Sequence, residues 1–380
     1  MAVERMTGWN LSRRVALCVT LVCLSLPALA GGYDQTNLVS DISGIAKFTN
    51  PKLVNPWGIA FSATSPIWIA DNGAGVSTLY HRDGTILPLV VTIPVPGGAC
   101  PNPPAAAPTG LVFNGDAKSF VVTKNGKSGS ALFIFSTEDG TISGWNPTVD
   151  TTCAVLEVDN SANPTADAGA VYKGLAIGQV EGKSFIYASN FRSGQVEMYD
   201  SQFHLVKTFT DASVPPGFAP FGVQNINGVL FVTFALQDDQ KHDDVAGPGN
   251  GFVDVFDLGG TLIKSFASGG VLNSPWGVAL APAHFGQFSN HVLIGNFGDG
   301  HINAFDLHSG KSDGPLKNDR GDAIFIGGLW GLKFGAGGAN NGPVNTLFFT
   351  AGIGDEGHGL FGTITVNACE ENEDQNESRH

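Results

Sequence analysis

Short polar segments that follow apolar runs carry the side chains of this sequence that could bind a ligand or do chemistry. They hold carboxylates, amides, imidazoles and one guanidinium. The candidate binding residues are Asp71, Asn72, Glu138, Asp139, Asn190, Arg192, Asp238, Asp239, His242, Asn296, Asp299, Asp355 and His358. Ca²⁺ prefers oxygen ligands, about six to eight around one ion. We therefore consider Ca²⁺ as a cofactor, with Glu138, Asp139, Asp71 and Asp355 as the candidate metal ligands.

The same residue types also have a structural explanation. Asp and Asn, together with Gly, form tight turns because their side chains hydrogen-bond to the nearby backbone and tolerate a positive φ. Glu138 is the candidate least typical of a turn. The segment 238–244 is longer than a hairpin needs, and surplus length in a loop often serves binding. Turn formation and ligand binding both stay open at this point.

Common catalytic motifs are missing from the sequence. It contains no G-x-S-x-G, H-E-x-x-H or G-x-x-x-x-G-K-[ST] pattern and no EF-hand spacing. His242, His301 and His358 lie in or just after the polar segments, and a zinc site made from them would need three distant segments to meet. No catalytic residue is assigned, and whether the protein is an enzyme stays open.

The elements that must position these residues are strands. Glycine accounts for 51 of the 380 residues and charged residues for 14 %, whereas 26 residues are Phe. Gly in a helix interior costs about 1 kcal/mol relative to Ala, and the helix formers Lys, Glu and Arg are scarce. Val, Ile, Thr and Phe set among Gly, Asn, Asp and Pro favour strands joined by turns. The composition predicts an all-β protein.

One short pattern recurs along the chain at intervals of about 50 residues, which is typical of a β-propeller. It is an apolar or aromatic residue, then Gly, then the start of an apolar strand, and its glycines are Gly58, Gly110, Gly174, Gly222, Gly277 and Gly331. Further strand-like runs separated by turns follow each glycine strand. Four strands in each of six units predict a six-bladed β-propeller.

The ends of the repeat array predict how the ring closes. The sixth unit lacks an outer strand, whereas Tyr33–Val39 precedes the first unit and has no partner there. We expect this segment to complete the last blade, which removes an exposed sheet edge. The repeated Gly lets the innermost strands approach one another. The aromatic residues beside it are expected to fill the wedges between blades, namely Trp57, Phe221, Trp276 and Trp330.

In a propeller, the loops joining second to third strands share one face with the loops between blades. We call it the top face, and we expect all the candidate residues to lie there. A small molecule, a glycan or a protein is the expected partner at this face.

Two segments resemble known repeat families. Asn55–Phe61, Ile67–Asn72 and Leu79–Gly84 resemble an NHL repeat with its Pro-x-Gly opening. The stretch Phe133–Pro147, with Glu138-Asp139-Gly140 as its most specific part, resembles a signature of a secreted, mostly bacterial family of uncharacterised six-bladed propellers. The resemblance covers about residues 35–366 and implies the six-bladed fold. It implies no established activity.

The two ends of the chain differ from the repeats. Residues 1–30 have a basic stretch, an apolar run and an Ala-Leu-Ala cleavage signature, which predicts a cleavable signal peptide and a secreted or periplasmic protein. Residues 31–368 are expected to form a single propeller. Residues 369–380 are expected to form an acidic, disordered tail. No later apolar run is long enough for a membrane span.

Three cysteines remain after the signal peptide. Cys100 follows the outer strand of the first unit and Cys153 opens the outer strand of the second. These positions are on neighbouring blades, so we expect a disulfide between them in an oxidising compartment. Cys369 in the tail is expected to stay free.

The charge of the chain limits its partners. A formal net charge of −14 repels phosphate backbones and anionic membrane surfaces, so we expect no nucleic-acid partner. We expect a monomer.

Three functions remain open. The first is an extracytoplasmic binding or interaction protein that uses its top-face loops. The second is a metal-assisted hydrolase or lactonase that resembles the six-bladed gluconolactonase-like enzymes, although their early Glu-Gly-Pro motif is missing. The third is a lyase, as in some NHL-like propellers with metal-bound histidines. The first is favoured because fold alone does not imply chemistry.

Overall fold

The computed structural model describes residues 32–100 and 105–367 of the chain. The chain divides into two units, Met1–Ala30 and Gly31–His380, and all described residues belong to the second. The predicted signal peptide, the predicted acidic tail and Cys369 lie outside the described residues. No helix in the described ranges is long and apolar enough to cross a membrane.

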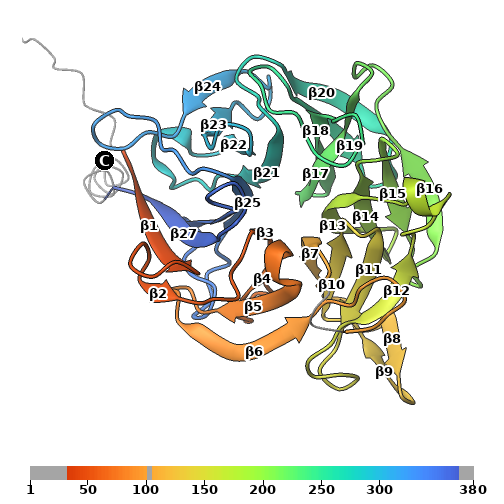
Figure 1. Cartoon of the computed structure of the whole chain (residues 1–380). Helices are drawn as coiled ribbons and strands as arrows, with labels where there is room; N and C mark the ends of the chain where they lie inside the picture. The colour runs from red at the N-terminus through yellow and green to blue at the C-terminus, as the bar shows by residue number, and fades with distance from the viewer. Residues whose placement is uncertain (1–31, 101–104, 368–380) are drawn as a thin grey trace, which may run out of the picture. The chain divides into compact units, whose positions relative to one another are not determined.

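The second unit is a six-bladed β-propeller, as predicted (Figure 1). Each blade is an antiparallel sheet whose first strand lies nearest the axis. Blades 1 to 3 are β3 (Pro56–Ala60), β4 (Ile67–Asp71), β5 (Val76–Tyr80) and β6 (Ile86–Thr92); β7 (Pro108–Phe113), β10 (Phe133–Thr137), β11 (Thr141–Trp145) and β12 (Val155–Asp159); and β13 (Tyr172–Val180), β14 (Lys183–Asn190), β15 (Gln195–Tyr199) and β16 (Leu205–Phe209).

Blades 4 to 6 repeat this arrangement. They are β17 (Phe218–Ile226), β18 (Val229–Leu236), β19 (Phe252–Asp257) and β20 (Leu262–Ser268); β21 (Pro275–Leu280), β22 (Val292–Asn296), β23 (Ile302–Phe305) and β24 (Ser312–Pro315); and β25 (Leu329–Phe334), β26 (Leu347–Ala351), β27 (Leu360–Val366) and β1 (Tyr33–Ser40). Three short 3₁₀ turns, η1 (Asn72–Ala74), η2 (Ala166–Ala168) and η3 (Gly286–Phe288), lie in connecting loops.

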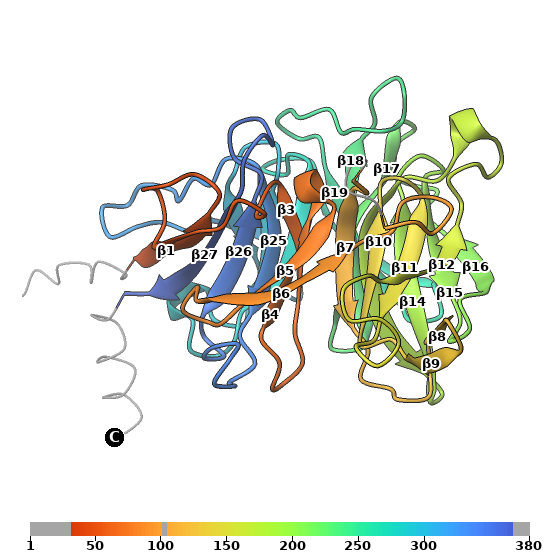
Figure 2. The same ribbon diagram turned by 60° about the horizontal axis from the view of Figure 1, so that its bottom comes forward.

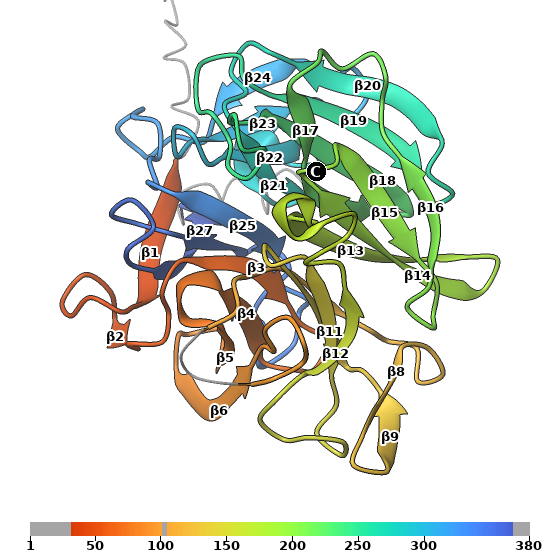
Figure 3. The ribbon, with the colours of Figure 1, turned by 45° about the vertical axis from the view of Figure 1, so that its right-hand side comes forward.

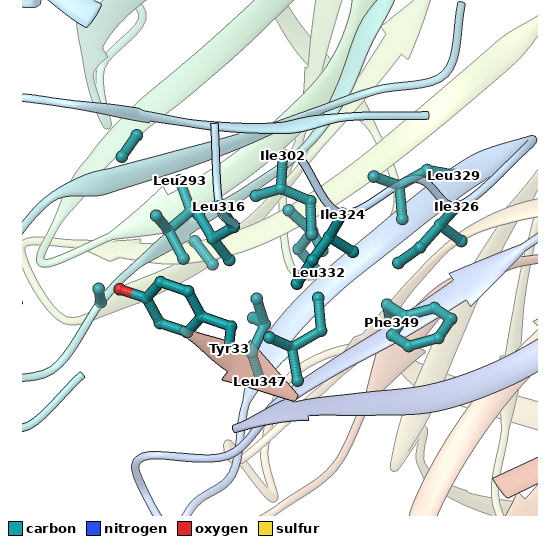
Figure 4. Packing of buried hydrophobic residues seen from close by; sticks show 14 of the residues in the cluster. Tyr33, Leu293, Ile302, Leu316, Ile324, Ile326, Leu329, Leu332, Leu347 and Phe349 are labelled. Carbon is teal, nitrogen blue, oxygen red and sulfur yellow. The ribbon is translucent and has the colours of Figure 1, made fainter. Parts of the chain in front are cut away.

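The N-terminal strand closes the ring, which confirms the prediction. β1 pairs antiparallel with β27 from Tyr33 opposite Val366 to Ser40 opposite Leu360. Its first side chain is anchored on blade 5, because the Tyr33 hydroxyl donates to the Phe285 carbonyl oxygen at 2.9 Å. Figure 4 shows Tyr33 packed among leucine and isoleucine side chains of the last two blades. A short β2 (Phe48–Thr49) adds in parallel outside β1.

The hydrophobic core is divided among the contacts between blades. Buried apolar side chains of neighbouring blades form a cluster at each of the blade interfaces, and a further cluster lies on the axis. Trp68 of blade 1, for example, stacks on Phe133 of blade 2 with ring centroids 4.1 Å apart. Stability is therefore distributed around the ring and depends on its closure.

The repeated glycines have the predicted role. A Cβ atom on Gly58 would lie 2.6 Å from the Thr109 carbonyl oxygen of the next blade, and one on Gly174 would lie 3.0 Å from the Phe221 carbonyl oxygen. Each repeated glycine meets the innermost strand of its neighbour in this way. Only a residue without a side chain allows the backbones to approach so closely.

The prediction for the aromatic residues beside these glycines was wrong about their place. Trp57, Phe221, Trp276 and Trp330 do not fill the wedges between blades but form the cluster on the axis. Trp57 and Trp330 stack with ring centroids 3.5 Å apart. The pairing register shifts at the Pro-x-Gly segments, for example between Pro56 and Ile59, and such an irregularity re-aims the intervening side chain.

Two features lie at the rim of the ring. The predicted disulfide joins Cys100 and Cys153, whose Cα atoms are 6.3 Å apart. A hairpin of β8 (Val121–Lys124) and β9 (Lys127–Ser130), which the repeat pattern did not predict, is inserted between the first two strands of blade 2. It stands beside β12 on the outside of the blade and away from the top face (Figures 2 and 3).

Candidate functional site

The residue before each repeated glycine lies near the start of an innermost strand. Five of the six equivalent residues are aromatic or small: Trp57, Thr109, Phe221, Trp276 and Trp330. The sixth is Lys173 at the start of β13, and only 2 % of its side chain is exposed. A charged group so deeply buried requires partners. Those partners define the candidate site.

The ammonium of Lys173 is bound by two carboxylates from neighbouring blades. Lys173 Nζ donates to Glu138 Oε1 and, at 3.0 Å, to Asp243 Oδ1. It also lies 5.3 Å from the ring centroid of Trp57 and 5.9 Å from that of Phe191. Two carboxylates and two aromatic faces together offset the loss of hydration of the ammonium.

Local turn geometry brings both carboxylates to the axis. Glu138 follows β10 in a tight turn, where its N–H donates to the Ala107 carbonyl oxygen at 2.9 Å and Gly140 takes a φ of 78°. Asp243 belongs to the loop 237–251 after β18. Asp238 shapes that loop, because its side chain accepts the backbone N–H of His242 at 2.8 Å.

Further polar residues extend this network across the top face. His242 Nδ1 lies 2.9 Å from the same oxygen of Asp243 that binds Lys173. Asn72 Nδ2 donates to Glu138 Oε2 at 2.7 Å, and Asn55 Nδ2 donates to Glu356 Oε2 at 2.7 Å. We call these seven residues the Lys173 cluster: Asn55, Asn72, Glu138, Lys173, His242, Asp243 and Glu356.

The electrostatics of the cluster favour a charged lysine. Burial alone would lower the pKa of Lys173, but Glu138 and Asp243 outweigh it and raise the pKa above its ordinary value. The hydrogen bond from His242 holds the pKa of Asp243 well below its usual range. Glu356 differs, because burial raises its pKa to about 7. The cluster therefore contains one permanent cation and one carboxylic acid that titrates near neutrality.

The structure brings three of the predicted binding residues into the cluster, namely Asn72, Glu138 and His242. It does not bring the four predicted metal ligands together. Asp71 is fully buried within blade 1, and this burial raises its pKa although the carboxylate accepts a hydrogen bond from the Thr78 hydroxyl at 2.8 Å. Asp139 accepts the Ala107 N–H at 2.8 Å, and Asp355 is exposed.

Three predicted residues line a separate cleft beside the cluster. Asn190, Arg192 and Asp239 lie around a cleft of about 420 Å³ between blades 3 and 4. Arg192 Nη1 donates to the Gly169 carbonyl oxygen at 2.8 Å, and its Nε is buried without a partner among the described residues. Asn190 is structural, because its Nδ2 donates to Glu197 at 2.7 Å within the blade.

The other predicted residues hydrogen-bond within their own loops or to neighbouring segments and do not join the cluster. Asn296 Nδ2 donates to the Val271 carbonyl oxygen at 2.7 Å, and Asp299 accepts the N–H of His301 at 3.1 Å. His358 Nδ1 lies 2.7 Å from Asp41 Oδ2. Because His242, His301 and His358 each pair with a different aspartate, the three imidazoles do not converge on a zinc site.

One group of residues in the described ranges has the spacing of metal ligands. One ligand atom from each of Glu138, His242 and Asp243 lies within 4.8 Å of the other two. Lys173 already donates to both carboxylates of this group. Of the four predicted Ca²⁺ ligands, only Glu138 belongs to this group, and it holds an ammonium.

Sequence reasoning missed Lys173 and Asn55 as site residues. The signal for Lys173 was present, because a lysine interrupts a repeated position that is otherwise occupied by aromatic residues and a threonine. Asp243 and Glu356 lie in two of the polar segments considered but were not among the candidates. Their inward orientation depends on the turn backbone, which residue types alone do not determine.

The comparisons with known proteins identify relatives of the whole propeller. No model of a known protein family matches the chain. It is 32 % identical over 335 residues to uncharacterized protein R648 of Acanthamoeba polyphaga mimivirus, and the match covers 86 % of this chain and 78 % of that protein. The chain belongs to the R648 family. Uncharacterized protein L690 of the same virus is 29 % identical over 334 residues, which cover 86 % of this chain and 84 % of L690.

These R648-family relatives are viral, whereas the sequence resemblance was to a mostly bacterial family, so that part of the prediction is corrected. Solved structures extend the likeness of fold. The soluble aldose sugar dehydrogenase of Escherichia coli has a TM-score of 0.54 at 13 % identity, covering 88 % of this chain and 100 % of that chain. A gluconolactonase of Xanthomonas campestris has a TM-score of 0.50 at 12 % identity, and the match covers 83 % of this chain and 87 % of that chain. At such identities the likeness is one of fold.

Proposed function

We propose that the protein is an extracytoplasmic binding protein whose Lys173 cluster recognises a neutral, hydroxyl-rich small molecule of the saccharide class. The observation that carries this proposal is the assembly of acceptor groups around a buried ammonium at the top of the axis. Asn55, Glu138, Asp243 and Glu356 come from different blades and meet there. Such convergence is typical of a binding site rather than of independent turns.

The charge balance of the cluster supports a neutral ligand. Lys173 offsets one carboxylate, Glu356 is partly protonated near pH 7, and His242 has a raised pKa because it hydrogen-bonds to Asp243. Little net charge remains to attract an ion. Carboxylate and amide oxygens accept hydrogen bonds, so a ligand that offers many hydroxyl donors complements them.

Partly exposed aromatic side chains support the same class of ligand. Trp276 and Phe297 are half-buried at the edge of the axial cluster, and Phe297 stacks on Trp330 at 4.0 Å. Flat aromatic surfaces next to polar groups suit the C–H faces of sugar rings, which are apolar while their edges are polar. Asp243, with 66 % of its side chain exposed, is open to such a ligand.

The direct test is binding to defined saccharides. The labelled full chain is applied to an array of mono- and oligosaccharides, and the strongest binder is measured by calorimetry. Glu356→Gln should weaken this binding, whereas Asp355→Asn, which removes a neighbouring exposed carboxylate outside the cluster, should not. Absence of saccharide binding, or equal affinity of both variants and the unchanged protein, would contradict the proposal.

A metal-assisted hydrolase or lyase is the second candidate. The close approach of Glu138, His242 and Asp243 favours it, and Glu356 has the pKa of a general acid or base. Lys173 opposes it, since a divalent ion on the same two carboxylates would lie close to an ammonium. Metal analysis after dialysis separates the two functions. A stoichiometric retained ion would favour the enzyme.

An extracytoplasmic location is part of the proposal. It is supported by the N-terminal sequence pattern and by the Cys100–Cys153 disulfide, since disulfides persist mainly in oxidising compartments. Cell fractionation of the full-length chain tests it. Retention of the uncleaved chain in the cytosol would contradict it.

A further inference from the structure

The bottom end of the axis holds a second cavity that the candidate site does not use. It has a volume of about 330 Å³ and is walled by the ends of the innermost strands of five blades. Most of the residues that line it are of apolar types and include Phe61, Leu111, Phe113 and Ile177. A constriction of only about 30 Å³ on the axis, lined by Trp276 and the repeated glycines, lies above it. The two ends of the axis are therefore separate sites.

Among the described residues that line this cavity, one is a cation. Lys333, near the end of β25, lines it with its Nζ 5.2 Å from the ring centroid of Phe61. None of the described residues that line the cavity is acidic, and Lys333 has no ion-pair or hydrogen-bond partner in the described part of the chain. Burial lowers its pKa below the ordinary value for lysine. A charge without a partner in such surroundings is unfavourable unless a ligand supplies the counter-charge.

Two polar side chains line the cavity with the lysine, and one of them has no partner. Gln224 of β17 lines the same cavity, and its side-chain amide has no hydrogen-bond partner among the described residues. Asn225 beside it is occupied, because its Nδ2 donates to the Ile177 carbonyl oxygen at 2.8 Å. One ammonium and one amide donor match the two oxygens of a carboxylate. They do not match the several donors that a phosphate usually collects.

We propose that the cavity around Lys333 binds a small organic monocarboxylate, with the carboxylate on Lys333 and Gln224 and an apolar body against Phe61, Leu111 and Phe113. Its volume is at the small end of the range for small-molecule pockets. The chain has a net charge of −14, yet none of its described carboxylates lines this cavity, so Lys333 has no counter-charge there. This site is independent of the function proposed for the top face.

The test uses hexanoate as the probe, with hexanol, hexylamine and inorganic phosphate as controls. Calorimetry on the full chain should show saturable binding of hexanoate at one site and weaker binding of hexanol. Lys333→Met should reduce hexanoate affinity about tenfold or more and leave hexanol unchanged, as expected for loss of one charge-assisted contact. The matched control is Lys127→Met, which removes an exposed lysine outside the cavity and should bind like the unchanged protein.

A second measurement does not depend on a variant. Reductive methylation of the folded chain, followed by peptide mapping, should modify Lys333 more slowly when hexanoate is present and equally fast when hexylamine is present. The proposal would be overturned if hexanoate showed no saturable binding or bound Lys333→Met as tightly as the unchanged protein. It would also be overturned if hexanoate did not protect Lys333 from methylation. Phosphate binding as tight as hexanoate would overturn the assignment to a carboxylate with an apolar body.

Discussion

The two ends of the propeller axis each hold a lysine, and the surroundings of the two lysines are opposite. Lys173 at the top is held by Glu138 and Asp243, and its pKa is raised. Lys333 at the bottom faces Phe61 and has no carboxylate partner among the described residues, and burial lowers its pKa. The same residue type thus completes a network at one end and leaves a charge to be balanced at the other.

The difference shows how blade repeats produce distinct sites. Both lysines lie on innermost strands, which every blade supplies in the same geometry. The partners come from loops, which differ in length and turn type from blade to blade. The loop 237–251 brings Asp243 to the top face, whereas the bottom cavity is walled by strand ends that carry apolar side chains. Loops therefore decide which cation is neutralised.

The largest loss of stability should come from a change that lies outside both ends of the propeller axis. Replacing Cys100 and Cys153 by Ala removes the link between blades 1 and 2 and should lower the free energy of unfolding by about 4 kcal/mol in the chain-entropy model. Ligand binding at both ends should persist, since neither cysteine lines them. Denaturant unfolding with and without the replacements measures the loss, and an unchanged midpoint would contradict it.

Breaking the top network should have the next largest effect. Lys173→Met leaves Glu138 and Asp243 without their shared cation and should cost about 3 kcal/mol of unfolding free energy. This value is at the low end for a buried pair because Asp243 is 66 % exposed and can be hydrated. The exposed control Lys127→Met should cost almost nothing. Equal costs for both variants would show that the network does not stabilise the fold.

Glu356 predicts a pH dependence at the top end. Its pKa is raised to about 7 by burial, whereas in the unfolded chain it has the ordinary value of about 4.3. The folded state therefore holds a proton that the unfolded state loses, and stability falls as the pH rises between these values. In the Glu356→Gln variant, the free energy of unfolding should decrease by about 1–2 kcal/mol less over this pH range than in the unchanged protein. A pH profile of unfolding that is the same in both proteins would contradict the assignment.

Removal of the lysine at the bottom end should stabilise the protein, and this effect should be smaller than the loss expected at the top end. Lys333→Met removes a half-buried charge that has no partner among the described residues, so we expect stabilisation by about 1 kcal/mol rather than a loss. Because the pKa of Lys333 is lowered by burial, the stability of the unchanged protein should rise toward that of the variant as the pH approaches the ordinary pKa of lysine. Thermal unfolding between pH 7 and 10 tests this, and destabilisation by the variant would indicate an unrecognised partner of Lys333.

The fold could be predicted because each blade repeats one physical requirement. Glycine is needed wherever innermost strands approach, so Gly58 and its equivalents mark every blade in the sequence. The β1 closure followed from a missing outer strand and an unpaired segment. The β8–β9 hairpin could not be predicted in this way, because an insertion in one blade follows no repeat. The axial position of Trp57 and Trp330 was also missed, since it depends on register shifts that residue types do not specify.

The site was predictable only in part. Asn72, Glu138 and His242 were found because polar residues in top-face loops stand out against apolar strands. Glu356 and Asp355 are adjacent and both have positive φ values, 63° and 52°, yet only Glu356 reaches the cluster. Residue type cannot distinguish two neighbouring acids in one turn. Lys173 was hidden because it lies in a strand, although comparing the six equivalent positions would have revealed it.

The central claim is that Lys173 serves as the cation of the top-face carboxylates, and a calcium titration with matched sodium chloride tests it most directly. Melting temperatures are measured for the unchanged protein and for Lys173→Met at equal ionic strength. We expect Ca²⁺ and sodium chloride to shift the unchanged protein equally. Lys173→Met, with Glu138, His242 and Asp243 released, should gain a calcium-specific shift that follows the ligand concentration. A calcium-specific shift in the unchanged protein, or none in the variant, would contradict the account.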